Sequence, residues 1–397
     1  MALRQLATMR GHMSAPIRSV FAITLAVSLV SAIGGVPFNT MPLLLSSFDP
    51  ALGLTGDELG TLSSLAFFGY LVGTLSGPVW VDRVNWRNTS LTVSILAAVM
   101  FALSANAGGM MLKISWVGFG FFCSLMHALC MRILAEMPDE ERAYGTRLSV
   151  ELITISALLY VLPIFFISKY HYVGAAWALA GFVLILGLGA FLMPERQTDG
   201  AAAQTAAFPG WHQAKTSWIA LGVFLLYCLA NVGLWIFLAK IGEKFNPEPA
   251  QFSTMFAMLK IIGGAAGIIG ALIGSRAGNR LPNMICFLII GLGCYGIYRA
   301  TDFNSFMIAC WVWEFGFTMG CIYQTAGVAR FDPTNRLVVL VPTAFAISSV
   351  VGAKLAGMLS AGGDYTALYI FVAICSLIPG LYYASLKKGA IAVTAAQ

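Results

Sequence analysis

Charged residues are scarce in this sequence. Only 10% of its 397 residues are Asp, Glu, Lys or Arg, whereas 59% are hydrophobic. A typical soluble domain carries about 25% charged residues, most of them on its surface. This chain has too little polar surface to cover a water-soluble globule of its length, so a soluble protein is excluded.

The sequence signatures of common enzymes are also missing. We find no GxxxxGK[ST] loop for nucleotide phosphates, no GxSxG for a serine nucleophile and no cluster of metal ligands. The segment GLGCYG (291–296) fits the pattern GxGxxG, but it follows no strand and lies inside an apolar run. Glycines at that position serve helix packing, so we expect neither an enzyme nor a protein with a metal or cofactor.

The eight cysteines carry no further signal. They include no CxxC pair and no Cys–His group, and all of them fall within apolar runs. In such surroundings a cysteine behaves as a small hydrophobic residue. We therefore expect the cysteines to be part of the core.

Long apolar runs are what the sequence has in abundance. Each is about 20 residues long, which is enough to cross roughly 30 Å of hydrocarbon as a helix. The runs are apolar on all sides instead of alternating, which favours helices over barrel strands. The sequence therefore predicts an all-α membrane protein with twelve transmembrane helices. The runs are 19–44, 57–81, 88–107, 111–135, 146–168, 172–193, 217–240, 251–274, 282–299, 304–328, 336–361 and 366–386.

Basic residues are distributed unevenly between the two ends of these helices. About fifteen Lys and Arg residues, Arg147 among them, fall on one side, and about five fall on the other. By the positive-inside rule both termini are expected in the cytoplasm of a multi-pass cell-membrane protein, such as one of a bacterial inner membrane. The same bias explains the net charge of +6. A nucleic-acid partner is therefore not needed to explain the positive charge, and the expected surroundings of the chain are membrane lipids.

An internal repeat divides the chain into two halves. GPVWVDRVNWR (77–87) matches GALIGSRAGNR (270–280) at an offset of 193, and AEMPDEER (135–142) matches ARFDPTNR (329–336) at an offset of 194. These offsets move the second helix onto the eighth, as in a duplicated bundle of six helices. The predicted organisation is an N-terminal six-helix bundle (1–194), a polar cytoplasmic linker (195–216) and a C-terminal six-helix bundle (217–397).

Two six-helix halves with a charged DRxxxR loop between the second and third helices resemble the major facilitator superfamily. The loop signature of that family is GxxxDRxGRR. Asp82, Arg83 and Arg87 match it, whereas Pro78, Asn85 and Trp86 stand where the signature has a Gly, a Gly and an Arg. The resemblance implies the major facilitator fold and a secondary transporter that works by alternating access. It also implies a small-molecule substrate and a protein that works as a monomer.

The charged loop and its repeat predict a latch between the bundles. An Asp at a helix end and Arg residues on a short turn can make charge-assisted contacts with neighbouring helix ends. The resemblance implies that such contacts keep the cytoplasmic side closed in the outward-facing state. Alternatively, these charges only set the membrane topology. The expected latch residues are Asp82, Arg83, Arg87, Arg276, Arg280, Glu136 and Arg142.

Four ionisable residues interrupt the interiors of predicted helices: His127, Lys260, Glu314 and Lys354. A charge at mid-membrane costs at least about 3 kcal/mol on insertion scales, so such residues usually face a partner or a water-filled cavity. The resemblance places their helices around the central cavity. Lys260 and Glu314 could instead form a structural salt bridge, and His127 could be a hydrogen-bonded core residue. Lys354 has no evident acidic partner at its depth, which makes it the stronger ligand candidate.

These residues predict a small organic anion as substrate, for example an aromatic or aliphatic carboxylate, moved together with protons. The two alternatives are a proton antiporter that exports amphiphilic drugs and a receptor or scaffold that does not transport. The expected substrate contacts are Lys354, Lys260, His127, Tyr227, Asn231, Trp235, Trp311 and Asn39. The expected proton-coupling residues are Glu314, His127 and Glu151.

Overall fold

Helices make up nearly the whole of the computed structural model, which describes residues 17–48, 56–195, 209–332, 334, 336–360 and 364–386. The first half contains α2 (Ile17–Ser46), α3 (Gly56–Trp80), α4 (Trp86–Asn106), α5 (Gly109–Leu134), α6 (Glu140–Val161), η2 (Leu162–Ile167), α7 (Ser168–Gly187) and η3 (Leu188–Leu192). The second half contains α8 (Lys215–Glu243), α9 (Pro249–Ile273), η5 (Gly274–Ala277), α10 (Arg280–Arg299), α11 (Phe303–Arg330), η6 (Leu337–Leu340), α12 (Val341–Ile347), η7 (Ser348–Gly352), α13 (Ala353–Leu359) and α14 (Thr366–Ser385).

Eleven segments of the described residues are long and apolar enough to cross a membrane. One of them, Glu140–Leu192, covers two of the predicted runs, which meet near His171, where φ is 50°. The twelve predicted runs therefore all correspond to helices, and the predicted all-α membrane fold is confirmed. The chain is a multi-pass membrane protein.

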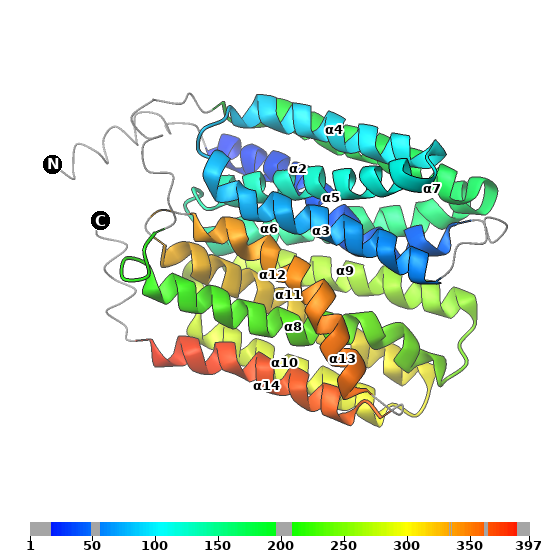
Figure 1. Ribbon diagram of the computed structural model, residues 1–397. Helices are drawn as coiled ribbons and strands as arrows, with labels where there is room; N and C mark the ends of the chain where they lie inside the picture. The colour runs from blue at the N-terminus through cyan, green and yellow to red at the C-terminus, as the bar shows by residue number, and fades with distance from the viewer. Residues whose placement is uncertain are drawn as a thin grey trace.

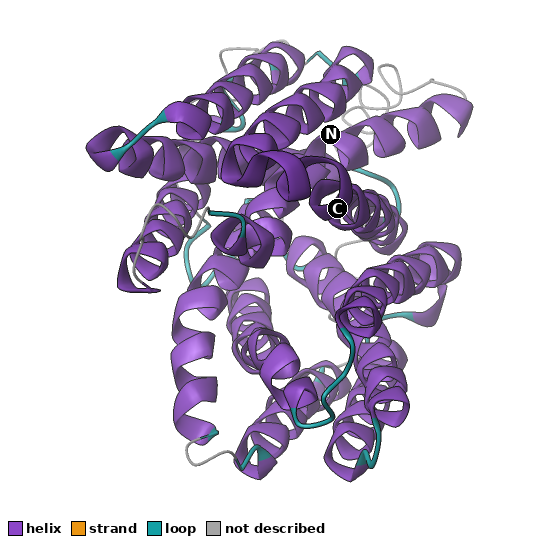
Figure 2. Ribbon diagram, turned by 90° about the vertical axis from the view of Figure 1, so that its right-hand side faces the viewer, coloured by secondary structure: helices purple, strands orange, loops and turns teal. Residues whose placement is uncertain are grey.

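The helices form two bundles, one above the other in Figure 1 and again in Figure 2. Helices α2–α7 pack against one another, and helices α8–α14 do the same. We call the face where α2 begins and α14 ends the terminal face, and the opposite face the distal face (Figure 1). The linker predicted at 195–216 stays a prediction, because 196–208 lie outside the described residues.

The predicted duplication is visible in one pair of hydrogen bonds. Arg87, at the start of α4, donates to the carbonyl of Met193 at 3.0 and 3.1 Å. Arg280, at the start of α10, donates to the carbonyl of Leu386 at 3.0 Å. Donor and acceptor are each shifted by 193 positions between the two bonds, which is the offset of the sequence repeat. Each arginine thus ties the last helix of its own bundle to the third.

The two bundles meet along α6 and α9, which are antiparallel and in close contact. Glycines allow this approach: a Cβ on Gly145 would lie 2.6 Å from the backbone nitrogen of Ala271, and one on Gly264 would lie 2.7 Å from Ile153. Toward the distal face, Ser156 donates to the carbonyl of Ala257 at 3.2 Å. Small residues that let two helices approach this closely are a common interface device in membranes.

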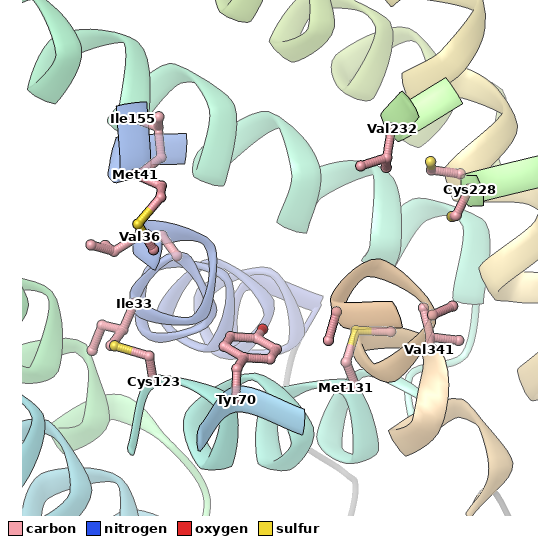
Figure 3. Close-up of a cluster of buried hydrophobic side chains, with 14 of the residues drawn as sticks. Ile33, Val36, Met41, Tyr70, Cys123, Met131, Ile155, Cys228, Val232 and Val341 are labelled. Atoms are coloured by element: carbon pink, nitrogen blue, oxygen red, sulfur yellow. The ribbon is translucent and has the colours of Figure 1, made fainter. Parts of the chain in front are cut away.

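Apolar side chains complete the contact between the bundles nearer the terminal face. Figure 3 shows Met131 of α5 beside Val341 of α12, with Tyr70 in the same buried cluster. Helices α12 and α13 both pack against α8, but α12 also packs against α3 and α5, whereas α13 also packs against α14. The π-helical turn η7 separates the two short helices, so this span changes its neighbours as it crosses the molecule.

Candidate functional site

A buried polar network lies in the N-terminal bundle. Tyr70 Oη is 2.5 Å from His127 Nδ1, and His127 Nε2 is 2.5 Å from Arg147 Nη2. Arg147 also donates to Ser31 Oγ at 2.9 Å and forms an ion pair with Glu151 one turn further along α6. All five side chains are buried. The network therefore connects α2, α3, α5 and α6 through hydrogen bonds in addition to their apolar contacts.

The partners of His127 define its protonation state in this structure. An arginine guanidinium carries only donors, so His127 Nε2 must accept from Arg147. The remaining ring nitrogen, Nδ1, then carries the proton and faces Tyr70 Oη. His127 is thus a neutral imidazole here. A second proton could reach Nε2 only if Arg147 moved away.

Two glycines of α2 make room for this network. A Cβ on Gly34 would lie 2.7 Å from His127 Cγ, and one on Gly35 would lie 2.7 Å from Glu151 Cδ. Real Cβ atoms do not approach other atoms so closely, so any larger residue would push these side chains away. The pair GlyGly in α2 is therefore explained by the approach of His127 and Glu151.

A second buried ion pair lies in the C-terminal bundle. Lys260 of α9 is 3.6 Å from Glu314 Oε1 of α11, and the two residues are 6% and 2% exposed. The Lys260 ammonium also lies 3.9 Å from the ring centroid of Trp235 on α8, a cation–π contact. The salt bridge between Lys260 and Glu314, which the sequence analysis considered as an alternative, is present.

The two ion pairs lie on either side of the contact between the bundles. Glu151 belongs to α6 and Lys260 to α9, and these helices pack along their length. The positive charge of Lys260 acts electrostatically on Glu151 as well as on Glu314. The charge of Lys260 thus influences carboxylates of both bundles, although its direct ion pair is with Glu314 of its own bundle.

Two predicted substrate contacts belong to the core of the C-terminal bundle. Tyr227 donates to the carbonyl of Phe317 at 2.9 Å. Asn231 donates to Ser376 at 3.1 Å and accepts from Trp313 at 2.9 Å. Both side chains are at most 1% exposed. Their polar atoms already have partners on α11 and α14, so in this conformation they connect helices and are not open to a ligand.

The structure corrects the expected burial of Lys354, whose side chain is exposed. Gly352 and Ala356 face α8, where a Cβ on Gly233 would lie 3.0 and 3.1 Å from them. A residue midway between two that face α8 points to the opposite side of the helix. Lys354 is therefore not a cation buried among apolar groups.

The remaining candidates are half-buried side chains. Trp311 donates to the carbonyl of Met255 at 3.2 Å and so connects α11 to α9. Asn39 donates at 2.8 Å to the carbonyl of Gly35, which is one turn earlier on its own helix. Trp235, by contrast, contacts Lys260 directly and belongs to the ion-pair site.

At the terminal face, Asp82 holds two arginines from different bundles. It pairs with Arg132 of α5 at 3.0 Å and with Arg336, just before η6, at 3.2 Å. Arg132 also pairs with Glu136 at 2.8 Å. Asp82 and Arg336 are each only 11% exposed, so water screens their pairing weakly. This ion pair joins the two bundles directly.

A second set of polar contacts crosses the terminal face. Arg330, at the end of α11, pairs with Glu141 and with Glu140 at the start of α6. Asp139, which caps α6, accepts from the backbone nitrogen and the hydroxyl of Ser275 at 3.3 and 3.2 Å. Ser275 stands where the first repeat has Asp82. In the second repeat the carboxylate therefore comes from the opposite bundle. We call the contacts of Asp82, Asp139 and Arg330 between the bundles the latch.

Several residues expected in the latch lie elsewhere. Arg87 and Arg280 bind carbonyls of their own bundles. The side chains of Arg83, Arg276 and Arg142 are exposed. Residue type and repeat position were therefore not enough to identify which side chains make the contacts between bundles.

We expect Asp82→Asn to reduce transport several-fold without reducing the amount of folded protein. The substitution removes the charge that holds Arg336, so the population shifts away from the state closed at the terminal face. The measurement is initial flux per folded protein in reconstituted vesicles. Arg276→Gln is the matched control, since it removes an exposed charge from the equivalent turn of the second repeat. Equal flux in Asp82→Asn and parent protein would show that the latch plays no part in transport.

Sequence reasoning did not place Arg147 in a buried network or Arg330 and Arg336 in the latch, because their charges were assigned to topology and to the repeat. One signal could have identified Arg147: it lies four residues before Glu151, the spacing at which side chains meet on a helix.

Comparison with known proteins agrees with this architecture. The family model described as Major Facilitator Superfamily matches residues 19–335, which is most of the chain. The chain therefore belongs to the major facilitator superfamily, a family of membrane transporters. No curated relative matches it at a significant level.

Three solved structures illustrate the shared fold. The proton:xylose symporter XylE, bound to 6-bromo-6-deoxy-D-glucose, has a TM-score of 0.71 at 14% identity, over 93% of this chain and 96% of that one. FucP in the outward conformation has a TM-score of 0.69 at 14% identity, over 92% of this chain and 97% of that one. The human organic anion transporter MFSD10 (TETRAN) has a TM-score of 0.71 at 14% identity, over 93% and 100%.

Proposed function

We propose that this protein is a proton-coupled secondary transporter of a small organic anion, with a carboxylate as the charged group. The observation that carries the proposal is the pair of ion pairs, Arg147–Glu151 and Lys260–Glu314, that face each other across α6 and α9. With Lys354, these residues sum to one net positive charge, which favours an anion over a cation.

Coupling follows from competition for Lys260. A proton bound to Glu314 removes its negative charge and leaves Lys260 free to bind a carboxylate. When Glu314 loses that proton, it competes with the carboxylate for Lys260 and favours release. Lys260 is thus the proposed principal contact, and Lys354 is a second contact exposed on α13. Glu151 and His127 are further proposed proton-accepting groups, since both are titratable and share Arg147 as a partner.

The proposed orientation has the terminal face in the cytoplasm of a cell membrane. It rests on the excess of Lys and Arg at that face. The latch then closes the cytoplasmic side, and the substrate reaches Lys260 from the distal face.

The test is uptake of a panel of carboxylates by reconstituted vesicles, with and without an imposed proton gradient. We expect Lys260→Ala to abolish uptake, and Lys354→Ala to weaken it more than Lys354→Arg does. Lys113→Ala is the control, since Lys113 is another exposed lysine on a different helix. Preferential transport of lipophilic cations would instead indicate an amphiphile exporter. Binding without any flux would indicate a receptor.

A further inference from the structure

Aromatic side chains line the distal side of Lys260. Because α9 begins at the distal face, Phe252 and Phe256 lie about two turns and one turn distal of Lys260. Their rings stack with centroids 5.8 Å apart. The ring of Trp235 meets Phe256 edge-on, with centroids 5.5 Å apart and an interplanar angle of 86°. All three rings are half-buried. We call Trp235, Phe252 and Phe256 the aromatic wall.

The Lys260 ammonium lies at similar distances from Trp235 of this wall and from the Glu314 carboxylate. It lies 3.9 Å from the Trp235 ring centroid and 3.6 Å from Glu314 Oε1. A charge-assisted hydrogen bond between such groups normally spans about 2.7–2.9 Å. The ion pair is therefore loose, and any anion that binds the ammonium lies beside the face of an indole ring.

On the terminal side of Lys260, the space next to α9 is already filled. One turn in that direction, a Cβ on Gly263 would lie 2.8 Å from Leu152 Cδ1 and 2.9 Å from Glu314 Oε1. Even a methyl group would collide there. A carboxylate bound to Lys260 must therefore extend its apolar part toward the distal face, along the aromatic wall.

We infer that the anion recognised at Lys260 is an aromatic carboxylate, with its ring packed against Trp235 and Phe256. This inference rests on the proposed function and narrows it to one substrate class. A planar ring stacks on an aromatic surface more favourably than a saturated ring of equal size, by about 0.5–1.5 kcal/mol, which corresponds to a roughly twofold to tenfold preference.

The test compares benzoate with cyclohexanecarboxylate, which carry the same charge and have similar size. Binding is measured by thermal stabilisation of the purified full-length protein as each acid is titrated. Parent protein should bind benzoate about twofold to tenfold more tightly. Trp235→Leu should bring this ratio close to one, and Trp235→Phe should retain part of it. Trp177→Leu is the matched control, because Trp177 is a half-exposed tryptophan of α7 in the other bundle.

The possible outcomes distinguish a failure of the aromatic assignment from a failure of the proposed function. Equal binding of the two acids by parent protein, or an unchanged ratio in Trp235→Leu, overturns the aromatic assignment and leaves the anion transporter in place. If neither acid stabilises the protein and neither is taken up by vesicles, both proposals fail. If Trp235→Leu does not fold, Phe256→Leu takes its place, with the same expected loss of preference.

Discussion

Arg147→Leu should lower the stability of the folded protein by about 3–5 kcal/mol, the usual cost of removing one partner from a buried ion pair. The guanidinium bridges Ser31, His127 and Glu151, all of which are buried. Its loss leaves the Glu151 carboxylate without its direct ion-pair partner in the interior of the bundle. The measurement is the unfolding midpoint of purified protein in detergent, compared with parent protein.

Two further variants separate this cause from a general disturbance of α6. Arg142→Leu removes an exposed arginine of the same helix and should change stability by less than about 0.5 kcal/mol. Arg147→Leu combined with Glu151→Leu removes both charges and should recover much of the lost stability, since a buried pair can be replaced by apolar residues at little cost. If Arg147→Leu alone lowered the stability as little as Arg142→Leu does, the ion pair would not stabilise the bundle.

Glu314→Gln should abolish proton-driven accumulation of the substrate while exchange of substrate across the membrane continues. Glutamine resembles protonated glutamate, so Lys260 stays free to bind the anion, but no proton can be released to complete the cycle. Accumulation against a gradient should fall at least about tenfold. The measurement compares gradient-driven uptake with exchange in vesicles that hold the same amount of protein.

The structural alternative for Glu314 predicts a different pattern. If the carboxylate only neutralises Lys260, then Glu314→Gln should lower stability and leave the pH dependence of uptake unchanged. Leu152→Val serves as a control for local packing, because Leu152 also lies near Gly263 and carries no charge. Unchanged accumulation in Glu314→Gln would remove this residue from the coupling mechanism.

The twelve helices could be predicted from the sequence because a membrane span is a local property of the chain. Twenty consecutive apolar residues specify a helix whatever their neighbours are. The repeat added the division into two bundles, and the bonds of Arg87 and Arg280 carry the same offset. Helix ends were less certain. The fifth run was expected from residue 146, whereas α6 begins at Glu140 after the cap of Asp139, and so Arg147 lies about two turns into the helix instead of at its start.

The partners of polar residues could not be read in the same way. A polar side chain on an apolar helix can be satisfied by a ligand or by a neighbouring helix, and only tertiary packing decides between them. Asn231 has its partners on α11 and α14, so it is part of the core. Lys354 follows a π-helical turn that rotates the rest of its span, and no residue pattern in this segment predicted that turn. Lys260 and Glu314, by contrast, were recognised from charge and depth alone.

Proton movement that accompanies anion uptake is the most direct measurement of the coupling at the two ion pairs. Vesicles loaded with a pH-sensitive dye and containing parent protein should acidify inside as the carboxylate enters, beyond the passive acidification of protein-free vesicles. Glu314→Gln vesicles should acidify no more than the protein-free ones. Carboxylate accumulation by parent protein without any additional acidification would contradict proton coupling through Lys260 and Glu314.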